Sequence, residues 1–175
     1  MARKILALCT GNAARSVMLG YMLDTLGEAN AEEWSVRSAG TLVSEGRAMS
    51  ARTRDALLKI PELRHHHFGA HRSHRLSNDD VEWSDVILAM EASHVVLVRH
   101  RFLKASARTV VLGQFLREAP LDATWGEQVS FVASLDPNPA FDVDDPAGGD
   151  QDVYDACAQQ LWEMARIFST LVANQ

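Results

Sequence analysis

Four short apolar runs, separated by longer segments with helical spacing, are the feature that most constrains the fold of this chain. The apolar runs comprise residues 5–8, 34–39, 86–90 and 109–112. The segments with helical spacing comprise residues 16–26, 50–60, 92–101 and 152–172. A chain that alternates buried strands with amphipathic helices typically builds a parallel sheet covered by helices. The sequence therefore predicts an α/β fold.

Local signals predict where the helices end. Gly27 indicates the end of the first helix, and Pro61 requires the second to end before it. Residues 113–145 hold three prolines and predict one long irregular segment, of a kind that tends to be functional or mobile. The last helix should bury an apolar stripe formed by Val153, Cys157, Leu161, Met164, Ile167, Phe168 and Leu171.

Composition limits the class of protein. The chain has 175 residues, of which 47% are hydrophobic, so we expect a single domain spanning residues 1–175 with its own core. A formal net charge of −6 and the lack of a basic run argue against nucleic acid or an anionic membrane as partner. The run 5–8 is too short for a signal peptide or a membrane span. Two cysteines form no disulfide framework, and we expect a cytoplasmic protein with reduced thiols.

The segment Cys-Thr-Gly-Asn-Ala-Ala-Arg-Ser, residues 9–16, follows the first apolar run and precedes the first helix. This is the edge at which open α/β sheets bind ligands, and backbone N–H groups at a helix N-terminus form a cradle for anions. We expect Gly11 to adopt a conformation closed to other residues and Asn12 to tolerate left-handed geometry. Arg15 offers a planar fork of donors matched to phosphate oxygens. The residues expected to bind phosphate are Thr10, Gly11, Asn12, Ala13, Ala14 and Arg15.

Cys9 would lie beneath the phosphorus atom as a nucleophile. The inward N–H groups and Arg15 favour its thiolate, to which the Ser16 hydroxyl can donate a further hydrogen bond. The alternative interpretation makes Cys9 a buried strand-end residue and Arg15 a surface residue, but it leaves the Thr-Gly-Asn composition unexplained. A nucleotide-binding P-loop is excluded because no Gly-Lys-Ser/Thr follows.

This segment resembles the Cys-x-Gly-Asn-x-Cys-Arg-Ser-Pro signature of the low-molecular-weight protein tyrosine phosphatase family. Residues 38–41, 71–73, 85–91 and 145–149 also resemble family segments, in the family order. The resemblance implies a four-stranded parallel sheet flanked by helices, with the phosphate loop between the first strand and the first helix. It implies hydrolysis of a phosphorylated protein or peptide through a cysteinyl-phosphate intermediate, with neither metal nor cofactor.

The chain departs from the family signature at two positions. Ala14 stands where many members carry a second cysteine, so the nearby disulfide partner that protects some members from oxidation is missing. Val17 replaces proline, which is a mild change because the first turn of a helix accepts either residue.

The leaving group of a phosphate ester needs a proton donor, and two Asp-Pro pairs compete for that role. Asp145 matches the family pattern because glycines and then the last helix follow it, whereas Asp136 has no such context and remains the alternative. Aspartate before proline is also common turn chemistry. The resemblance gives His71 a supporting role, in which it holds the loop through Asn12.

The remaining histidines and the second cysteine are interpreted as structural. Residues 65–67 are consecutive histidines in an expected loop, and they lack the spacing of a metal site. We therefore expect a solvated loop and no bound metal. Cys157 lies on the apolar stripe of the last helix and is expected in the core.

Substrate class is less constrained. Tyrosine-directed members of the family carry an aromatic residue at the position of Ala147, and arginine-directed members carry threonine at the position of Ala13. Phosphotyrosine is the first choice and phosphoarginine the second. In tyrosine-directed members that aromatic residue forms one wall of the slot for the phenyl ring. Here an aromatic residue from the long segment could replace it: Trp125, Phe131 or Phe141.

Two other classes of function fit the sequence less well. An arsenate reductase would need two further cysteines in a mobile segment, and only Cys157 remains. A non-catalytic phosphopeptide-binding module would be favoured if the nucleophile, the arginine or the acid were missing, and all three are present.

Overall fold

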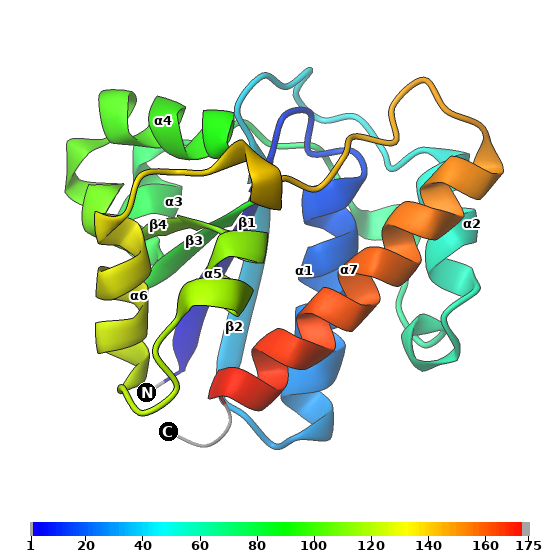
Figure 1. Ribbon diagram of the computed structural model, residues 1–175. Helices are drawn as coiled ribbons and strands as arrows, with labels where there is room; N and C mark the ends of the chain where they lie inside the picture. The colour runs from blue at the N-terminus through cyan, green and yellow to red at the C-terminus, as the bar shows by residue number, and fades with distance from the viewer. Residues whose placement is uncertain (1, 173–175) are drawn as a thin grey trace.

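Four parallel strands form the central sheet in the order β2-β1-β3-β4 (Figure 1). The strands are β1 (Arg3–Cys9), β2 (Trp34–Gly40), β3 (Val86–Ala89) and β4 (Thr109–Val111). The computed structural model describes residues 2–172, so the outermost residues of the expected domain 1–175 lie outside the described part. The predicted α/β fold with a four-stranded parallel sheet is confirmed.

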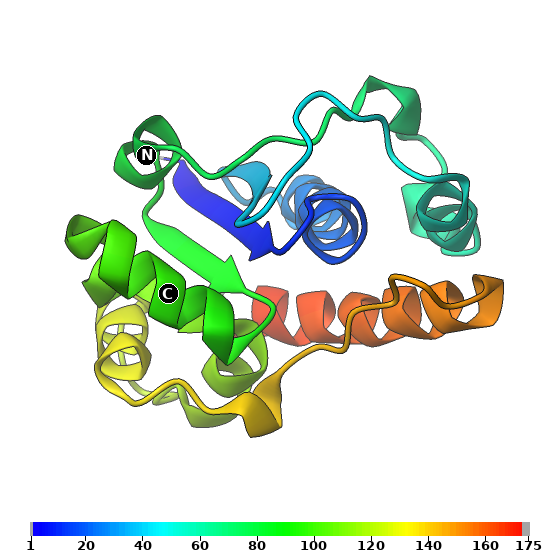
Figure 2. The ribbon, with the colours of Figure 1, turned by 90° about the horizontal axis from the view of Figure 1, so that it is seen from above.

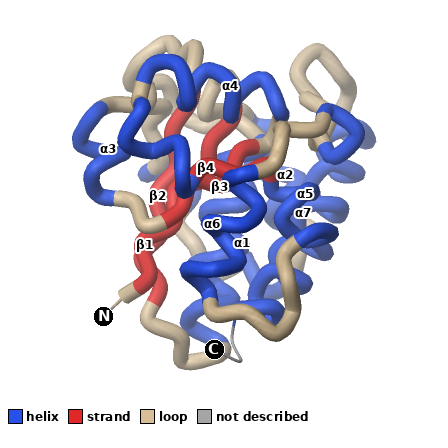
Figure 3. The backbone as a smooth tube through the Cα atoms, turned by 60° about the vertical axis from the view of Figure 1, so that its left-hand side comes forward, coloured by secondary structure: helices blue, strands red, loops and turns tan. Residues whose placement is uncertain are grey.

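Helices pack against both faces of the sheet (Figure 3). They are α1 (Arg15–Ala29), α2 (Ala51–Leu58), α3 (Asn78–Trp83), α4 (Ala92–Arg101), α5 (Leu112–Glu118), α6 (Trp125–Ser134) and α7 (Gln151–Val172). Because side chains alternate along a strand, Ile5 and Ala7 of β1 join the core beneath α1 and α7, while Leu6 and Leu8 pack toward α3 and α4. All four are fully buried, as expected for a central parallel strand.

All four strands end at the same edge of the sheet, seen from above in Figure 2. At this edge Cys9, the last residue of β1, pairs with Gly40 of β2. A Cβ on Gly40 would lie 2.6 Å from the carbonyl oxygen of Thr10 and 2.8 Å from the backbone nitrogen of Asn12. Only glycine therefore lets the end of β2 approach the loop that leaves β1 so closely.

Residues 113–145 were expected to be one irregular segment, and this prediction is wrong. The segment contains most of α5 and all of α6, with a short 3₁₀ turn at Pro139–Phe141. Thr124 and Glu127 form a capping box that starts α6, and Val129 and Val132 bury its apolar face. Short helices of this length carry too few periodic positions for the pattern to be recognised.

Two further helices differ from expectation, one in where it ends and one in being present at all. Helix α1 continues past Gly27 to Ala29, and the missing side chain of Gly27 leaves room for Trp34, whose ring atom would lie 3.2 Å from a Cβ on the glycine. Helix α3 was missed, although Ser77 and Asp80 form its capping box.

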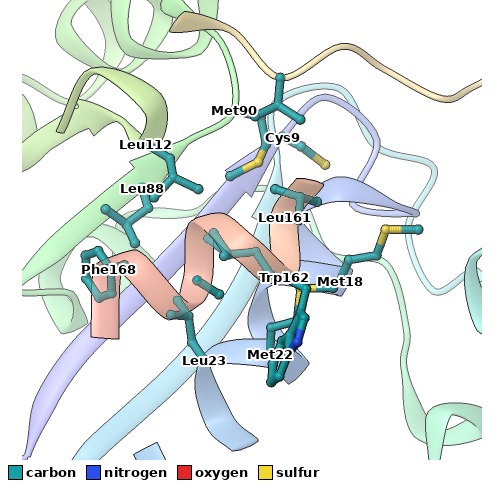
Figure 4. Packing of buried hydrophobic residues seen from close by; sticks show 14 of the residues in the cluster. Cys9, Met18, Met22, Leu23, Leu88, Met90, Leu112, Leu161, Trp162 and Phe168 are labelled. Atoms are coloured by element: carbon teal, nitrogen blue, oxygen red, sulfur yellow. The ribbon is translucent and has the colours of Figure 1, made fainter. Parts of the chain in front are cut away.

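The apolar stripe of α7 is only partly buried. Leu161 and Phe168 are fully buried, and Figure 4 shows them in the core with residues of α1 and β3. Cys157 is also buried, as expected, but Val153 and Ile167 are about half exposed, at 46% and 50%. The buried face of α7 is instead completed by small and aromatic residues, namely Tyr154, Ala158, Trp162 and Ala165.

Two substitutions on α7 test this assignment. Leu161→Ala should lower the free energy of unfolding by about 2–5 kcal/mol, because it removes buried methyl groups and leaves a cavity. Ile167→Ala, on the same helix, should change it by less than about 1 kcal/mol, since half of its side chain is in water. Chemical denaturation monitored by circular dichroism measures both. Equal losses for the two variants would contradict the observed face of α7.

Candidate active site

The loop between β1 and α1 surrounds the sulfur of Cys9. The backbone N–H of Asn12 points to Cys9 Sγ at 3.3 Å, and Ser16 Oγ lies 3.0 Å from the same sulfur. Cys9 is 3% exposed. Asn12 has φ of 49°, in the left-handed region, as expected. Gly11 does not adopt a positive φ, and a Cβ there would meet no atom within 4 Å, so the expected need for glycine at this position is wrong.

Asn12 is fully buried and links the loop to three other segments. Its amide nitrogen donates to Ser16 Oγ at 3.0 Å and to Ser38 Oγ at 2.9 Å. Its amide oxygen accepts a hydrogen bond from the backbone N–H of His74, and its carbonyl oxygen lies 2.9 Å from His71 Nε2. Burial lowers the pKa of His71, which favours a neutral ring that donates to this carbonyl. The structure thus places His71 where the family resemblance predicted it.

Arg15 is 1% exposed and its guanidinium contacts three segments. Nη1 donates to Glu91 Oε1 at 2.5 Å and to the carbonyl oxygen of Val143 at 2.8 Å. Nη2 donates to Asp145 Oδ2 at 2.6 Å, with Thr10 Oγ1 more distant at 3.4 Å. Although burial opposes it, the hydrogen bond from Arg15 lowers the pKa of Glu91. Two carboxylates therefore balance the buried charge of Arg15.

His94 of α4 is a buried neighbour that the sequence did not reveal. Its side chain is 4% exposed, and its Nε2 lies 2.9 Å from Thr10 Oγ1 and 3.9 Å from Glu91. Burial lowers the pKa of His94 to about 4, so the ring is neutral at physiological pH. Thr10 is thereby tied to α4 by a neutral hydrogen bond.

Other contacts that sequence reasoning missed support the same loop. Thr53 of α2 donates a hydrogen bond to the carbonyl oxygen of Ala13 at 2.9 Å. Ser38 and Glu91 lie within segments that resemble the family, and this was the signal that could have marked them. Thr53 and His94 lie outside those segments, and nothing local distinguishes them from ordinary helix residues.

The segment that carries Asp145 crosses this edge of the sheet. The backbone N–H of Val143 donates to the carbonyl oxygen of Met90 at 2.8 Å, which joins the segment to the end of β3. The side chain of Asp145 is 41% exposed, and its Oδ1 accepts a hydrogen bond from the N–H of Ala147 at 3.0 Å. Asp136 lies away from this cluster, where its backbone carbonyl accepts a hydrogen bond from Gln114. The structure brings Asp145, and not Asp136, to Arg15.

The histidine run 65–67 lies in a turn, where His66 Nε2 is 2.7 Å from Thr25 Oγ1. Within residues 2–172, no group of three or more His, Cys, Asp or Glu side chains is arranged to hold a metal ion. Over the same residues, no helix is long and apolar enough to cross a bilayer. Burial raises the pKa of Cys157 to about 11, so this thiol stays protonated.

Residues 4–125 match the model of the family described as low molecular weight phosphotyrosine protein phosphatase. A protein-arginine-phosphatase from Geobacillus stearothermophilus is 30% identical over 161 residues, which cover 92% of this chain and 90% of that protein.

Solved structures of family members have the same fold as this chain. The arginine phosphatase from Geobacillus stearothermophilus superposes with a TM-score of 0.73 at 27% identity, covering 96% of this chain and 91% of that chain. A low molecular weight protein tyrosine phosphatase from T. tengcongensis has the same fold, with a TM-score of 0.76 at 23% identity over 95% of this chain and 97% of that one. The chain therefore belongs to the low molecular weight phosphotyrosine protein phosphatase family and is a hydrolase of that family.

Proposed function

We propose that this protein removes phosphoryl groups from phosphorylated protein side chains, with Cys9 as nucleophile, Arg15 as phosphate clamp and Asp145 as general acid. The observation that carries the proposal is their convergence at one edge of the sheet. Cys9 Sγ lies beside the N–H of Asn12 and the hydroxyl of Ser16, and Arg15, at the end of the same loop, bonds to Asp145. Phosphoarginine is the substrate class that the surroundings favour.

In the first step, the phosphoryl group takes the place of the Asp145 carboxylate beside Arg15, and the displaced carboxylate takes up a proton from solvent. The Cys9 thiolate attacks phosphorus, an S–P bond forms, and the bond from phosphorus to the leaving nitrogen or oxygen breaks. Backbone N–H groups of the loop and the Arg15 fork stabilise the equatorial oxygens. Asp145 gives its proton to the leaving atom, so that the product departs neutral at that atom.

In the second step, water attacks the phosphocysteine and the S–P bond breaks. Asp145, now a carboxylate, accepts a proton from the water and returns to its acid form. The Ser16 hydroxyl, 3.0 Å from Cys9 Sγ, stabilises the departing thiolate. Inorganic phosphate leaves and the thiolate is ready for another cycle.

The surroundings of Asp145 favour a cationic substrate. A cavity of about 390 Å³ adjoins it, in which three carboxylates, those of Asp144, Asp145 and Asp152, share the lining with Gln160 and apolar residues, none of them aromatic. Phosphoarginine keeps a guanidinium group next to its phosphate, and a carboxylate-lined cavity attracts such a group. Ala147 provides no ring at the position where tyrosine-directed members have one. The relative from Geobacillus stearothermophilus is itself named a protein-arginine-phosphatase.

One observation favours phosphotyrosine as the second candidate. Leu42 is 71% exposed, and its backbone N–H donates to the carbonyl oxygen of Thr10, so an apolar side chain stands at the edge of the phosphate loop. A phenyl ring could rest against it. Trp125 does not serve as a wall, because it packs against Phe115 and Arg3, at the opposite end of β1 from Cys9.

Phe131 and Phe141, the other aromatic residues considered for the missing wall, lie on different elements. Phe131 is 47% exposed on α6. Phe141 packs against the cluster of Ala89 and Ala92, beneath the segment that carries Asp145. Neither lines the carboxylate-bearing cavity.

Cys9→Ser should abolish turnover of p-nitrophenyl phosphate while the fold stays intact, because an alcohol at neutral pH is a poor nucleophile. Arg15→Lys should be nearly as damaging, since lysine replaces a bidentate fork with a point charge. Cys157→Ala is the matched control and should keep its activity, because that thiol is buried and protonated. Steady-state kinetics and circular dichroism test all three. Full activity in Cys9→Ser would refute the mechanism.

Asp145→Asn should lower kcat/KM for phenyl phosphate by roughly 10²–10⁴-fold, the usual contribution of a positioned general acid. The loss for p-nitrophenyl phosphate should be much smaller, because that leaving group needs little protonation. The basic limb of the pH profile should also disappear. Asp136→Asn should change none of these values. If the two variants exchanged phenotypes, Asp136 would be the acid.

Substrate class is tested by comparing peptides that differ only in a phosphoarginine or a phosphotyrosine. We expect a higher kcat/KM for phosphoarginine, because the carboxylates near Asp145 attract the guanidinium. Asp152→Asn should reduce that preference and leave phosphotyrosine hydrolysis unchanged. A preference for phosphotyrosine that is lost in Leu42→Ala would favour the second candidate instead.

A further inference from the structure

In the proposed mechanism, Asp145 must stay in position after it loses its contact with Arg15. Its carboxylate contacts Arg15 and the N–H of Ala147, two residues further along its own segment. When a phosphoryl group occupies Arg15, the carboxylate gives up that partner. The position of the acid then depends on how the backbone just before it is held.

Asp142 is the last residue before Asp145 whose side chain forms a described hydrogen bond to another element. Its Oδ1 accepts a hydrogen bond of 2.7 Å from the N–H of Ala92, the first residue of α4. A helix N-terminus favours a carboxylate through its free N–H groups and its partial positive charge. The next residue, Val143, adds a backbone bond to Met90 and is 1% exposed. The two groups that hold the segment, the N–H of Ala92 and the carbonyl oxygen of Met90, both lie where β3 leads into α4.

The backbone before Asp142 is held equally closely. Phe141 packs into the cluster of Ala89 and Ala92. Its carbonyl oxygen would lie 2.5 Å from a Cβ on Gly113, so the chain approaches α5 at a distance that only glycine permits. The anchored stretch therefore ends at Val143, two residues before the acid.

Asp142 holds this position against unfavourable charges. Burial raises its pKa, and the carboxylates of Glu91 and Asp144 also raise it, while the bond from Ala92 and the charge of Arg15 lower it. The bond to the helix N-terminus is thus one of two interactions that offset the burial of this carboxylate and the repulsion from its neighbours.

We propose that Asp142 is a positioning residue for the general acid: by capping α4, it sets the height of Asp145 above the phosphate loop. The inference rests on the proposed role of Asp145. The Asp142 side chain forms its described hydrogen bond with Ala92 and not with Cys9 or Arg15, so we place its effect on catalysis in the backbone of residues 142–145.

Kinetics with a series of aryl phosphates test the proposal. Asp142→Ala should lower kcat/KM for phenyl phosphate by roughly 10–10²-fold, since a misplacement of about 1 Å can cost that much. The loss for p-nitrophenyl phosphate should be several times smaller. Asp142→Asn keeps an oxygen acceptor for Ala92 and should recover most of the activity. Asp136→Asn removes an exposed carboxylate from the same crossing segment and should behave as the unaltered protein.

A double variant separates positioning from a general loss of structure. Asp142→Ala combined with Asp145→Asn should be no slower than Asp145→Asn alone, because the acid whose position is set is already missing. Gly113→Ala, which displaces Phe141, should reproduce the leaving-group dependence of Asp142→Ala. Vanadate binds to the phosphate loop. Its inhibition constant should change by less than about twofold in Asp142→Ala, because the Asp142 side chain bonds to α4 and not to that loop.

The outcomes distinguish this inference from the proposed function. If Asp145→Asn shows the leaving-group effect and Asp142→Ala does not, Asp142 has no positioning role although the acid is correct. Equal losses for good and poor leaving groups in Asp142→Ala would also overturn the inference, since they would indicate damage to the phosphate loop. If Asp145→Asn itself lacks the effect, the proposed acid is wrong.

Discussion

The site depends on the burial of one positive charge, the guanidinium of Arg15. This group lies at the start of α1, and it bonds to the turn after β3 through Glu91 and to the crossing segment through Val143 and Asp145. A buried charge is stable only when it is paired and its hydrogen-bonding groups are satisfied. Three stretches far apart in the sequence must therefore fold onto this point together, and the position of the acid follows from that requirement.

Asn12 plays the corresponding part for the backbone of the phosphate loop. In its left-handed conformation its own N–H points to Cys9 Sγ, and its side chain bonds to Ser16, Ser38 and His74. The close approach at Gly40 lets β2 deliver Ser38 to this position. The conformation of the loop around the sulfur is thus fixed by hydrogen bonds to residues outside the loop as well as within it.

The sequence was sufficient for features that depend on neighbours along the chain. The strands, the main helices and the loop around Cys9 all carry local patterns, and family resemblance pointed to Asp145 and His71, which the structure brings into contact with Arg15 and Asn12. Features that depend on tertiary approach were not predictable: the bond from Asp142 to Ala92 joins residues 50 positions apart, and His94 shows its role only once Thr10 lies beside it. The assignment of positive φ to Gly11 failed because backbone conformation in such a loop is decided by the contacts of Asn12.

The pairing of Arg15 with Asp145 also bears on product release. Phosphate bound in the loop competes for the guanidinium with a carboxylate that is tethered to the same molecule, and therefore present at high effective concentration. When inorganic phosphate leaves the loop, Asp145 returns to Arg15 and opposes the rebinding of phosphate to the guanidinium. In the proposed mechanism, the side chain that delivers a proton to the leaving group is thus also an internal competitor of inorganic phosphate for Arg15.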